Sequence, residues 1–288
     1  MKTILVSTDL SASARHAAEY GYQLASLLKT NVVLCNAVTI PAATQEAAMI
    51  SWPVDEYDTL MDGSKKELHQ LKKELEQISS TDQFKPQITC ISEDGILADV
   101  VNQIAAKQPI DLVVIATHGH SGLTSLILGD HCHNMITELN TPLLIVPPAA
   151  SVADIKKIAF ATDFKRPSED LDHIYALVPL ARAFNAEILL THVYDEADTD
   201  QIFQKQIKPF LAELADKANY PHIYYRIVKN NKTEAGLNWL CLHGQVDMLA
   251  MVHRPHNFFD GLINGSHTKK MASQINVPLL VYPAFNKV

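Results

Sequence analysis

Residues 2–11 read KTILVSTDLS, and residues 157–166 read KIAFATDFKR. Each stretch begins with a lysine, continues as an apolar run and reaches the pair Thr-Asp where the run ends. A short continuous apolar run bounded in this way is typical of a strand that is buried on both faces of a sheet. The two stretches therefore predict a buried first strand that occurs twice in the chain.

The segments that follow also match each other. Residues 17–38 and 175–193 each give an amphipathic helix, a polar turn and an apolar strand. Further on, three residues of the first half recur 136 positions later: Asp111 with Asp247, Gly129 with Gly265, and Pro142 with Pro278. The sequence predicts two copies of one domain, domain 1 at residues 1–150 and domain 2 at residues 151–288.

The two copies differ in length. Asp9 and Asp163 are 154 positions apart, so the first copy carries about 18 extra residues. We place these residues in segment 41–66. The segment contains Trp52, and we interpret it either as a surface loop or as a lid or dimer contact.

Strands alternate with helices in each copy, which predicts an α/β fold with a parallel, doubly wound, five-stranded sheet. In the first copy we expect strands near residues 3–8, 31–38, 86–91, 111–116 and 142–146. A helix between the second and third strands would turn one apolar face to the core. The residues of that face are Leu60, Leu68, Leu71, Leu75 and Ile78.

Composition excludes several classes of protein. Of the 288 residues 47% are hydrophobic and 19% charged, as in a globular chain, and the formal net charge is −8. This charge argues against a nucleic-acid or anionic-membrane partner, and no apolar run approaches the ~18 residues of a membrane span. The four cysteines are scattered, and the start is too short for a signal-peptide core. We expect a reduced, cytoplasmic protein.

Residues 116–135 read ATHGHSGLTSLILGDHCHNM and follow the expected fourth strand. Ligands of doubly wound sheets bind at the carboxyl ends of strands where the strand order reverses, here the first and fourth strands. Glycines let backbone N–H groups approach a phosphate, and a helix that begins after Gly129 adds its positive dipole end. The stretch is therefore interpreted as a phosphate-binding loop.

Both halves resemble universal stress protein domains. Two features carry the resemblance: the Thr-Asp pair after the first strand and the late glycine that precedes a helix. The resemblance covers nearly the entire chain. It implies an adenine nucleotide alpha hydrolase-like fold with strand order 3-2-1-4-5. Nucleotide-binding members of the family carry Gly, two residues, Gly, nine residues, Gly, then Ser or Thr.

The resemblance implies a pocket for ATP or another adenine nucleotide in each copy. In the family, an aspartate after the first strand recognises adenine and ribose, and the end of the second strand lines the adenine pocket. In the first copy the matching residues are Asp9, Val38, Ala116, Gly119, Gly129 and Asp130. In the second copy they are Asp163, Val193, Gly265 and Ser266.

Both copies depart from the family pattern. Asp130 replaces Ser or Thr, and its carboxylate would repel phosphates unless a cation such as Mg²⁺ bridges them. Alternatively, Asp130 serves only as the N-cap of its helix. In the second copy Pro255 has no N–H donor, whereas His253 and Arg254 either add positive charge or lie on the surface.

A metal site is the other interpretation of the loop. Imidazole and carboxylate suit Zn²⁺, and the candidate ligands are His118, His120, Asp130 and His131. Residues 131 and 133 are about 200° apart on a helix, so only part of the histidine cluster could share one site. Surface positions are the alternative for these histidines.

Three functions stay open. The first is a non-enzymatic stress-response or signalling module, as the resemblance implies; the second is a slow ATPase or nucleotide-gated switch, and the third is a ligand-free scaffold. No constellation of catalytic residues has a diagnostic spacing. Family members usually dimerise through the last strand, so we expect strands 142–146 and 278–282 to pair as an internal pseudo-dimer. A homodimer of the chain is left open.

Overall fold

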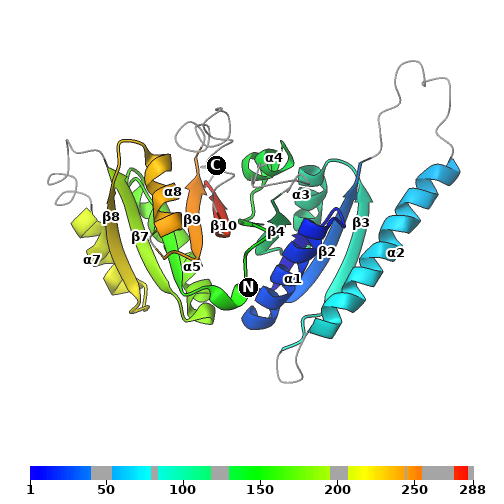
Figure 1. The fold of residues 1–288 in the computed structure, drawn as a ribbon, viewed down its shortest axis with the longest axis horizontal. Coiled ribbons are helices and arrows are strands. Elements are labelled where there is room, and N and C mark those ends of the chain that lie inside the picture. The colour runs from blue at the N-terminus through cyan, green and yellow to red at the C-terminus, as the bar shows by residue number, and fades with distance from the viewer. Residues whose placement is uncertain are drawn as a thin grey trace, which may run out of the picture. The chain divides into compact units, whose positions relative to one another are not determined.

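The computed structural model describes residues 1–39, 54–78, 84–117, 130–194, 207–243, 245–254 and 276–284. Strands and helices alternate along both halves of the chain, as the sequence predicts (Figure 1). In these ranges no helix combines the length and the apolar character that crossing a lipid bilayer requires. All four cysteines are free thiols.

The elements of the first copy lie close to the expected strand positions. In chain order they are β1 (Thr3–Ser7), α1 (Ala12–Leu28), β2 (Asn31–Val38), α2 (Val54–Ile78), β3 (Ile88–Asp94), α3 (Leu97–Lys107), β4 (Leu112–Ala116), α4 (Asp130–Glu138) and β5 (Leu143–Val146). Residues 54–66 of the extra segment begin α2 and are not a loop. Residues 41–53 lie outside the described ranges.

The described elements of the second copy follow the same order as far as the fourth strand. After a 3-10 turn (Val152–Asp154) come β6 (Lys157–Ala161), α5 (Pro167–Phe184), β7 (Glu187–Tyr194), α7 (Lys208–Lys217), β8 (Ile223–Lys229), α8 (Thr233–His243), β9 (Met248–His253) and β10 (Leu279–Pro283). The predicted domain boundary at residue 150 falls between β5 and the 3-10 turn; it stays a prediction.

Each copy contains a parallel sheet with its first strand in the middle. The strand order is β3-β2-β1-β4-β5 in the first copy and β8-β7-β6-β9-β10 in the second. β1 pairs in parallel with β2 and β4, and β6 pairs in parallel with β7 and β9. The predicted order 3-2-1-4-5 is confirmed in both copies, and it leaves a point of reversal beside each first strand.

An aspartate fixes the start of the first strand in each copy. Oδ2 of Asp247 accepts hydrogen bonds from the backbone N–H groups of Lys156 and Lys157, both at 2.8 Å. Asp111, its match in the first copy, accepts from the N–H groups of Lys2 and Thr3. The two aspartates that match in sequence therefore hold the start of the first strand in the same way in both copies.

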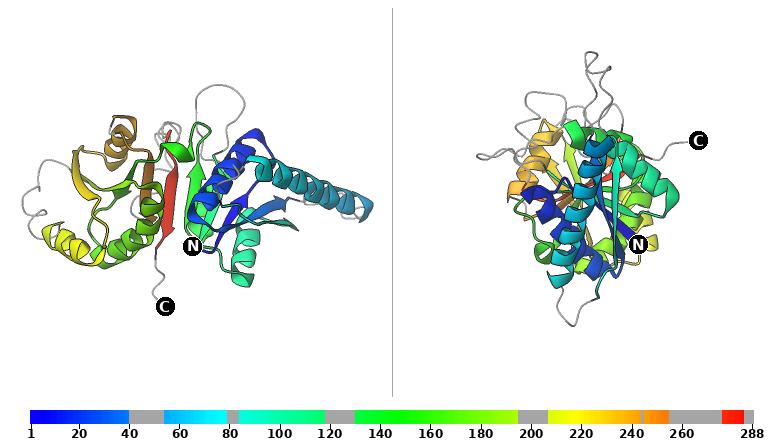
Figure 2. Two further views of the ribbon diagram at one scale, coloured as in Figure 1. Left: turned by 90° about the horizontal axis from the view of Figure 1, so that it is seen from below. Right: turned by 90° about the vertical axis from the view of Figure 1, so that its right-hand side faces the viewer.

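Helices cover both faces of each sheet. In the first copy α1 and α2 pack side by side on one face, and α3 lies on the other (Figure 2, left). In the second copy α5 and α7 share one face, and α8 lies on the other (Figure 2, left). This is the doubly wound arrangement, and the inner strands β1, β4, β6 and β9 are mostly buried, whereas the edge strands β3 and β8 are mostly half-buried or exposed.

The prediction of an apolar face on α2 is correct for the middle of the helix and wrong for its two ends. Leu68, Leu71 and Leu75 are buried, whereas Leu60 is 46% and Ile78 is 43% exposed. A helix of 25 residues spans about 37 Å, but a strand of 8 residues such as β2 spans only about 26 Å. The ends of α2 therefore extend past the sheet that would cover them.

Candidate functional site in the second copy

A tight turn joins the first strand to the first helix in each copy. In the second copy, Thr162 Oγ1 accepts from the N–H of Phe164 and Asp163 Oδ1 from the N–H of Lys165, both at 3.0 Å. Phe164 has a φ of 55°, a left-handed conformation that is unfavourable for a bulky side chain. The two side-chain bonds stabilise this turn, and so Thr-Asp sets the position of the Asp163 carboxylate.

The first copy builds the same turn from Thr8 and Asp9. Thr8 Oγ1 accepts from the N–H of Leu10 and Asp9 Oδ1 accepts from the N–H of Ser11, again at 3.0 Å. Leu10 has a φ of 67°. The shared Thr-Asp pair is thus explained by backbone geometry as well as by any role in binding.

The second strand of each copy is tied to this turn by a side chain. Asn36 Nδ2 donates to the carbonyl oxygen of Thr8 at 2.7 Å. His192 Nδ1 bonds the carbonyl oxygen of Thr162 at 2.9 Å. A carbonyl can only accept, so Nδ1 of His192 carries the proton of this bond. The ring of His192 is thereby fixed beside the end of β6.

A cavity of about 140 Å³ lies at the carboxyl ends of β6, β7 and β9. Because β6 stands between β7 and β9, this is the point where the strand order reverses. Its apolar lining comes from β6, β7, α8 and β9, namely Ala161, Val193, Leu237, Met251 and Val252. Its polar lining comprises Thr162, Asp163, Lys165, Thr191, His192, Thr233 and Arg254. Such a pocket suits a ligand with a flat apolar part and a polar part.

Gly236 lets α8 close on one wall of the cavity. A Cβ atom at this position would lie 2.6 Å from Cγ1 of Val193. Any larger residue would therefore push α8 away from β7. The close approach holds Leu237 and Thr233 of α8 near Val193, and it explains a glycine inside a helix.

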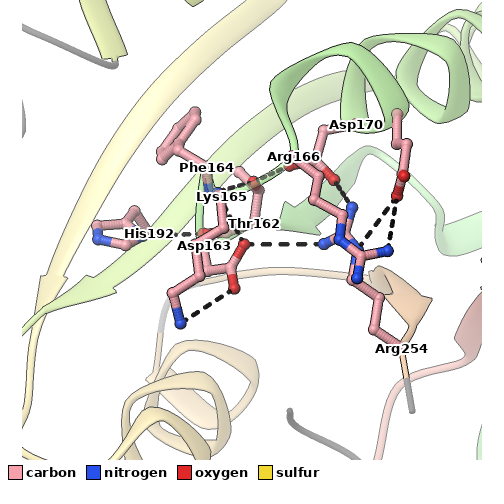
Figure 3. A network of polar contacts seen from close by, with 9 residues as sticks. Thr162, Asp163, Phe164, Lys165, Arg166, Asp170, His192 and Arg254 are labelled. Carbon is pink, nitrogen blue, oxygen red and sulfur yellow. Dashed lines mark hydrogen bonds and ion pairs between the residues drawn. The ribbon is translucent and has the colours of Figure 1, made fainter. Parts of the chain in front are cut away.

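Arg254 lies next to three carboxylates at the cavity (Figure 3). Its Nη2 donates to Oδ1 of Asp170 at 2.5 Å. Its Nη1 is 3.7 Å from Oδ1 of Asp163, and its Nε is 3.6 Å from Oε2 of Glu169. The side chain of Arg254 is 8% exposed and that of Asp170 is 0% exposed. The carboxylates therefore compensate a guanidinium group that is almost fully removed from water.

Asp170 connects this arginine to the turn after β6. Thr162 Oγ1 donates to Asp170 Oδ2 at 2.5 Å while it accepts from the N–H of Phe164. Burial raises the pKa of Asp170, and the hydrogen bonds from Thr162 and Arg254 oppose that rise. Burial and the charge of Arg254 lower the pKa of neighbouring His173 to about 4. The network is a rigid polar support under one side of the cavity.

Several predicted nucleotide-binding residues meet at the ends of strands. Asp163 and Val193 both line the cavity of the second copy. In the first copy, Val38 and Ala116 end β2 and β4, and Asp9 follows β1 between them. Six predicted residues lie outside the described ranges: His118, Gly119, His120, Gly129, Gly265 and Ser266. Asp130 and His131 begin α4, and their side chains are not described.

The metal interpretation lies mostly outside the described part of the chain. Within that part, no group of three or more His, Cys, Asp or Glu side chains could hold an ion together. The proposed ligands His118 and His120 are not described, so the zinc site stays a prediction.

Sequence reasoning missed most of the network around Arg254. The sequence allows Arg254 either to add positive charge or to lie on the surface, and the structure shows that it is buried. Asp170 and His173 were not identified at all, although both lie on the face of α5 that also buries Ile174 and Leu177. Polar residues on an otherwise apolar helix face were the available signal.

Each half of the chain matches one known protein family. A sequence model of the Universal stress protein family matches residues 1–147 and, separately, residues 154–283. The chain belongs to the universal stress protein family. The predicted family is confirmed, and this universal stress protein contains the family's domain twice.

Known relatives agree with this assignment. Universal stress protein MJ0577 of Methanocaldococcus jannaschii is 26% identical over 158 residues, which cover 50% of this chain and 94% of that protein. The crystal structure of a universal stress protein from Archaeoglobus fulgidus has a TM-score of 0.71 at 15% identity, covering 98% of both chains. A structure of a putative universal stress protein from Pseudomonas aeruginosa has a TM-score of 0.62 at 11% identity, covering 99% of this chain and 94% of that chain. The two structures share the fold of this tandem protein.

Proposed function

We propose that this tandem universal stress protein is a non-enzymatic stress-response or signalling module that binds an adenine nucleotide in its second domain. One observation carries the proposal: Asp163 and Val193, which the family pattern implies for adenine and ribose, line one cavity at the point of strand reversal.

The chemistry of the cavity supports a nucleoside group. Val193, Leu237 and Met251 offer apolar contact to a flat base, and the Asp163 carboxylate offers acceptors to ribose hydroxyls. Drug-sized ligands occupy pockets of about 300–1,000 Å³, so 140 Å³ suits the base alone, with sugar and phosphate toward the polar lining.

The remaining predictions extend this proposal. The first domain is proposed as a second nucleotide site built on Asp9, Val38 and Ala116, with Gly119, Gly129 and Asp130 at the phosphates. A cation such as Mg²⁺ would relieve the repulsion between Asp130 and a phosphate. Pairing of strands 142–146 and 278–282 as a pseudo-dimer also stays a prediction.

Calorimetric titration with AMP, ADP and ATP tests the function. Asp163→Asn keeps the oxygen that accepts from the N–H of Lys165 but removes the negative charge, so the turn should persist. We expect the wild type to bind and Asp163→Asn to lose roughly tenfold or more in affinity at the second-domain site. Asp9→Asn, the same change in the same turn of the first domain, should leave that site unaffected. Absence of binding to the wild type would contradict the proposal.

Phosphate release from ATP distinguishes the module from an enzyme. The proposal predicts release at the background rate in the wild type. Release above background that disappears in Asp163→Asn would favour a slow ATPase instead.

A further inference from the structure

Arg254 is a buried side chain with few hydrogen bonds. An arginine has five N–H donors, and a buried donor without an acceptor is unfavourable. Among the described residues, the guanidinium of Arg254 makes one hydrogen bond, to Asp170, and its buried Nε has none. The contacts to Asp163 and Glu169 at 3.7 and 3.6 Å are ion pairs that are longer than hydrogen bonds. The group retains capacity for further acceptors.

The guanidinium of Arg254 is part of the cavity lining, whereas most of the carboxylates that pair with it lie outside the lining. Of the three carboxylates near Arg254, Asp163 alone lines the cavity. Asp170 is fully buried and is itself held by Thr162. A carboxylate that is held in place behind an arginine orients it without competing for what enters the cavity in front.

Two cationic side chains on the lining can bind an anion. Lys165 and Arg254 contribute two positive charges and Asp163 one negative charge. The ammonium of Lys165 is 3.6 Å from Oδ2 of Asp163, on the other side of the carboxylate from Arg254 (Figure 3). The side chain of Lys165 is 71% exposed and can move toward a ligand at low cost.

We propose that Arg254, with Lys165 beside it, binds the phosphate of a nucleoside monophosphate in the second-domain cavity. The proposal rests on nucleotide binding by that cavity. It adds that the phosphate of the ligand makes the protein prefer a nucleotide over a nucleoside. A phosphate offers several charged acceptors, which form the strongest hydrogen bonds that a guanidinium makes.

The support for Arg254 is confined to the second domain. Helices α1 and α5 end in left-handed residues Lys29 and Asn185, which are 156 positions apart. The residue at the same distance from Asp170 is Ala14, which is buried in the core of the first domain. The first domain therefore has no carboxylate at this position, and the Asp170–Arg254 pair is a feature of the second domain.

The test compares AMP, adenosine and inorganic phosphate by calorimetry. Arg254→Met alone would leave the Asp170 carboxylate buried without its partner, which threatens the fold. The double variant Asp170→Ala/Arg254→Met removes both charges and gives the helix the alanine that the first domain has. Lys217→Met is a control that removes one charge from the surface of α7, where Lys217 pairs with Glu213.

The wild type should bind AMP about tenfold or more tightly than adenosine, because only AMP offers charged acceptors. At the second-domain site the double variant should bind AMP as weakly as adenosine, with adenosine affinity unchanged, and Lys217→Met should behave as the wild type. Phosphate should compete with AMP but not with adenosine.

Two results at the second-domain site would overturn the phosphate subsite while nucleotide binding stands: equal affinity for AMP and adenosine in the wild type, or a preference for AMP that survives in the double variant. If none of the three ligands binds, both proposals are wrong. Phosphate binding that requires Arg254, without any binding of adenosine, would support the phosphate subsite and contradict the proposal that the cavity binds a nucleotide.

Discussion

In the second domain, Nη2 of Arg254 donates to Oδ1 of Asp170 at 2.5 Å, joining the end of β9 to the first turn of α5. Both side chains are more than nine-tenths buried. An ion pair that is removed from water gains little over an apolar pair, but either partner alone is strongly unfavourable. The two residues therefore depend on each other for the stability of the domain.

Arg254→Met should lower the free energy of unfolding by about 3–5 kcal/mol, because the Asp170 carboxylate stays buried without its partner. Adding Asp170→Ala should restore most of that loss. Urea unfolding of the wild type, both single variants and the double variant measures the coupling. A double variant as unstable as the sum of its single variants would show that the pair does not act as a unit.

Acid should destabilise the second domain through His173. The pKa of this residue is lowered from 6.5 to about 4, first by burial and then by the charge of Arg254, while Asp172 and Glu169 oppose the shift. A lowered pKa means that the unfolded chain binds the proton first. The stability from neutral His173 is therefore complete above pH 6.5 and is lost as the pH falls toward 4, by roughly 2–3 kcal/mol.

Urea unfolding between pH 7 and pH 4 measures this loss. His173→Leu should flatten the dependence on pH over that interval, whereas His69→Gln, on the exposed face of α2, should leave it unchanged. An unaltered slope in His173→Leu would assign the acid sensitivity to other groups.

Gly236→Ala should weaken nucleotide binding. The added Cβ would lie 2.6 Å from Cγ1 of Val193, so α8 must shift at the cavity wall. We expect a loss of about 1–3 kcal/mol in unfolding free energy and a lower affinity for AMP.

Two matched glycine variants separate packing from binding. Gly21→Ala places its Cβ 2.7 Å from Cγ2 of Val6 in the first domain, so it should destabilise that domain without changing AMP affinity in the second. Gly63→Ala meets no atom within 4 Å in α2 and should stabilise the helix by up to about 1 kcal/mol. An effect of Gly21→Ala on second-domain binding equal to that of Gly236→Ala would contradict a local role for the α8 contact.

Asp247→Ala should loosen the start of β6. It removes the carboxylate that accepts from the N–H groups of Lys156 and Lys157, at a cost of about 1–3 kcal/mol. Hydrogen exchange of these two amides should accelerate, while exchange at Thr3, held by Asp111, should not change. Unchanged protection of Lys157 would show that the bond is dispensable.

The sequence was sufficient for features that depend on local pattern and repetition. The recurring Thr-Asp after an apolar run placed Asp163 at the carboxyl end of the first strand, and the alternation of strands and helices predicted a parallel, doubly wound sheet. Both follow from the geometry of parallel sheets and require no knowledge of distant contacts.

The pairing of Arg254 with Asp170 could not be predicted in this way. The residues are 84 positions apart, and no spacing rule connects the end of a fourth strand with the first turn of an earlier helix. Only the assembled sheet, which places β9 next to β6, brings them together. The ends of α2 were mispredicted for a related reason, because helical periodicity does not show where the covering sheet stops.

A crystal structure of the protein with bound AMP is the most direct test of nucleotide binding by the second domain. We expect the base to lie against Val193 and Leu237, the ribose at Asp163 and the phosphate at Arg254. A structure at saturating AMP with this cavity empty, or with AMP bound elsewhere on the chain, would contradict it.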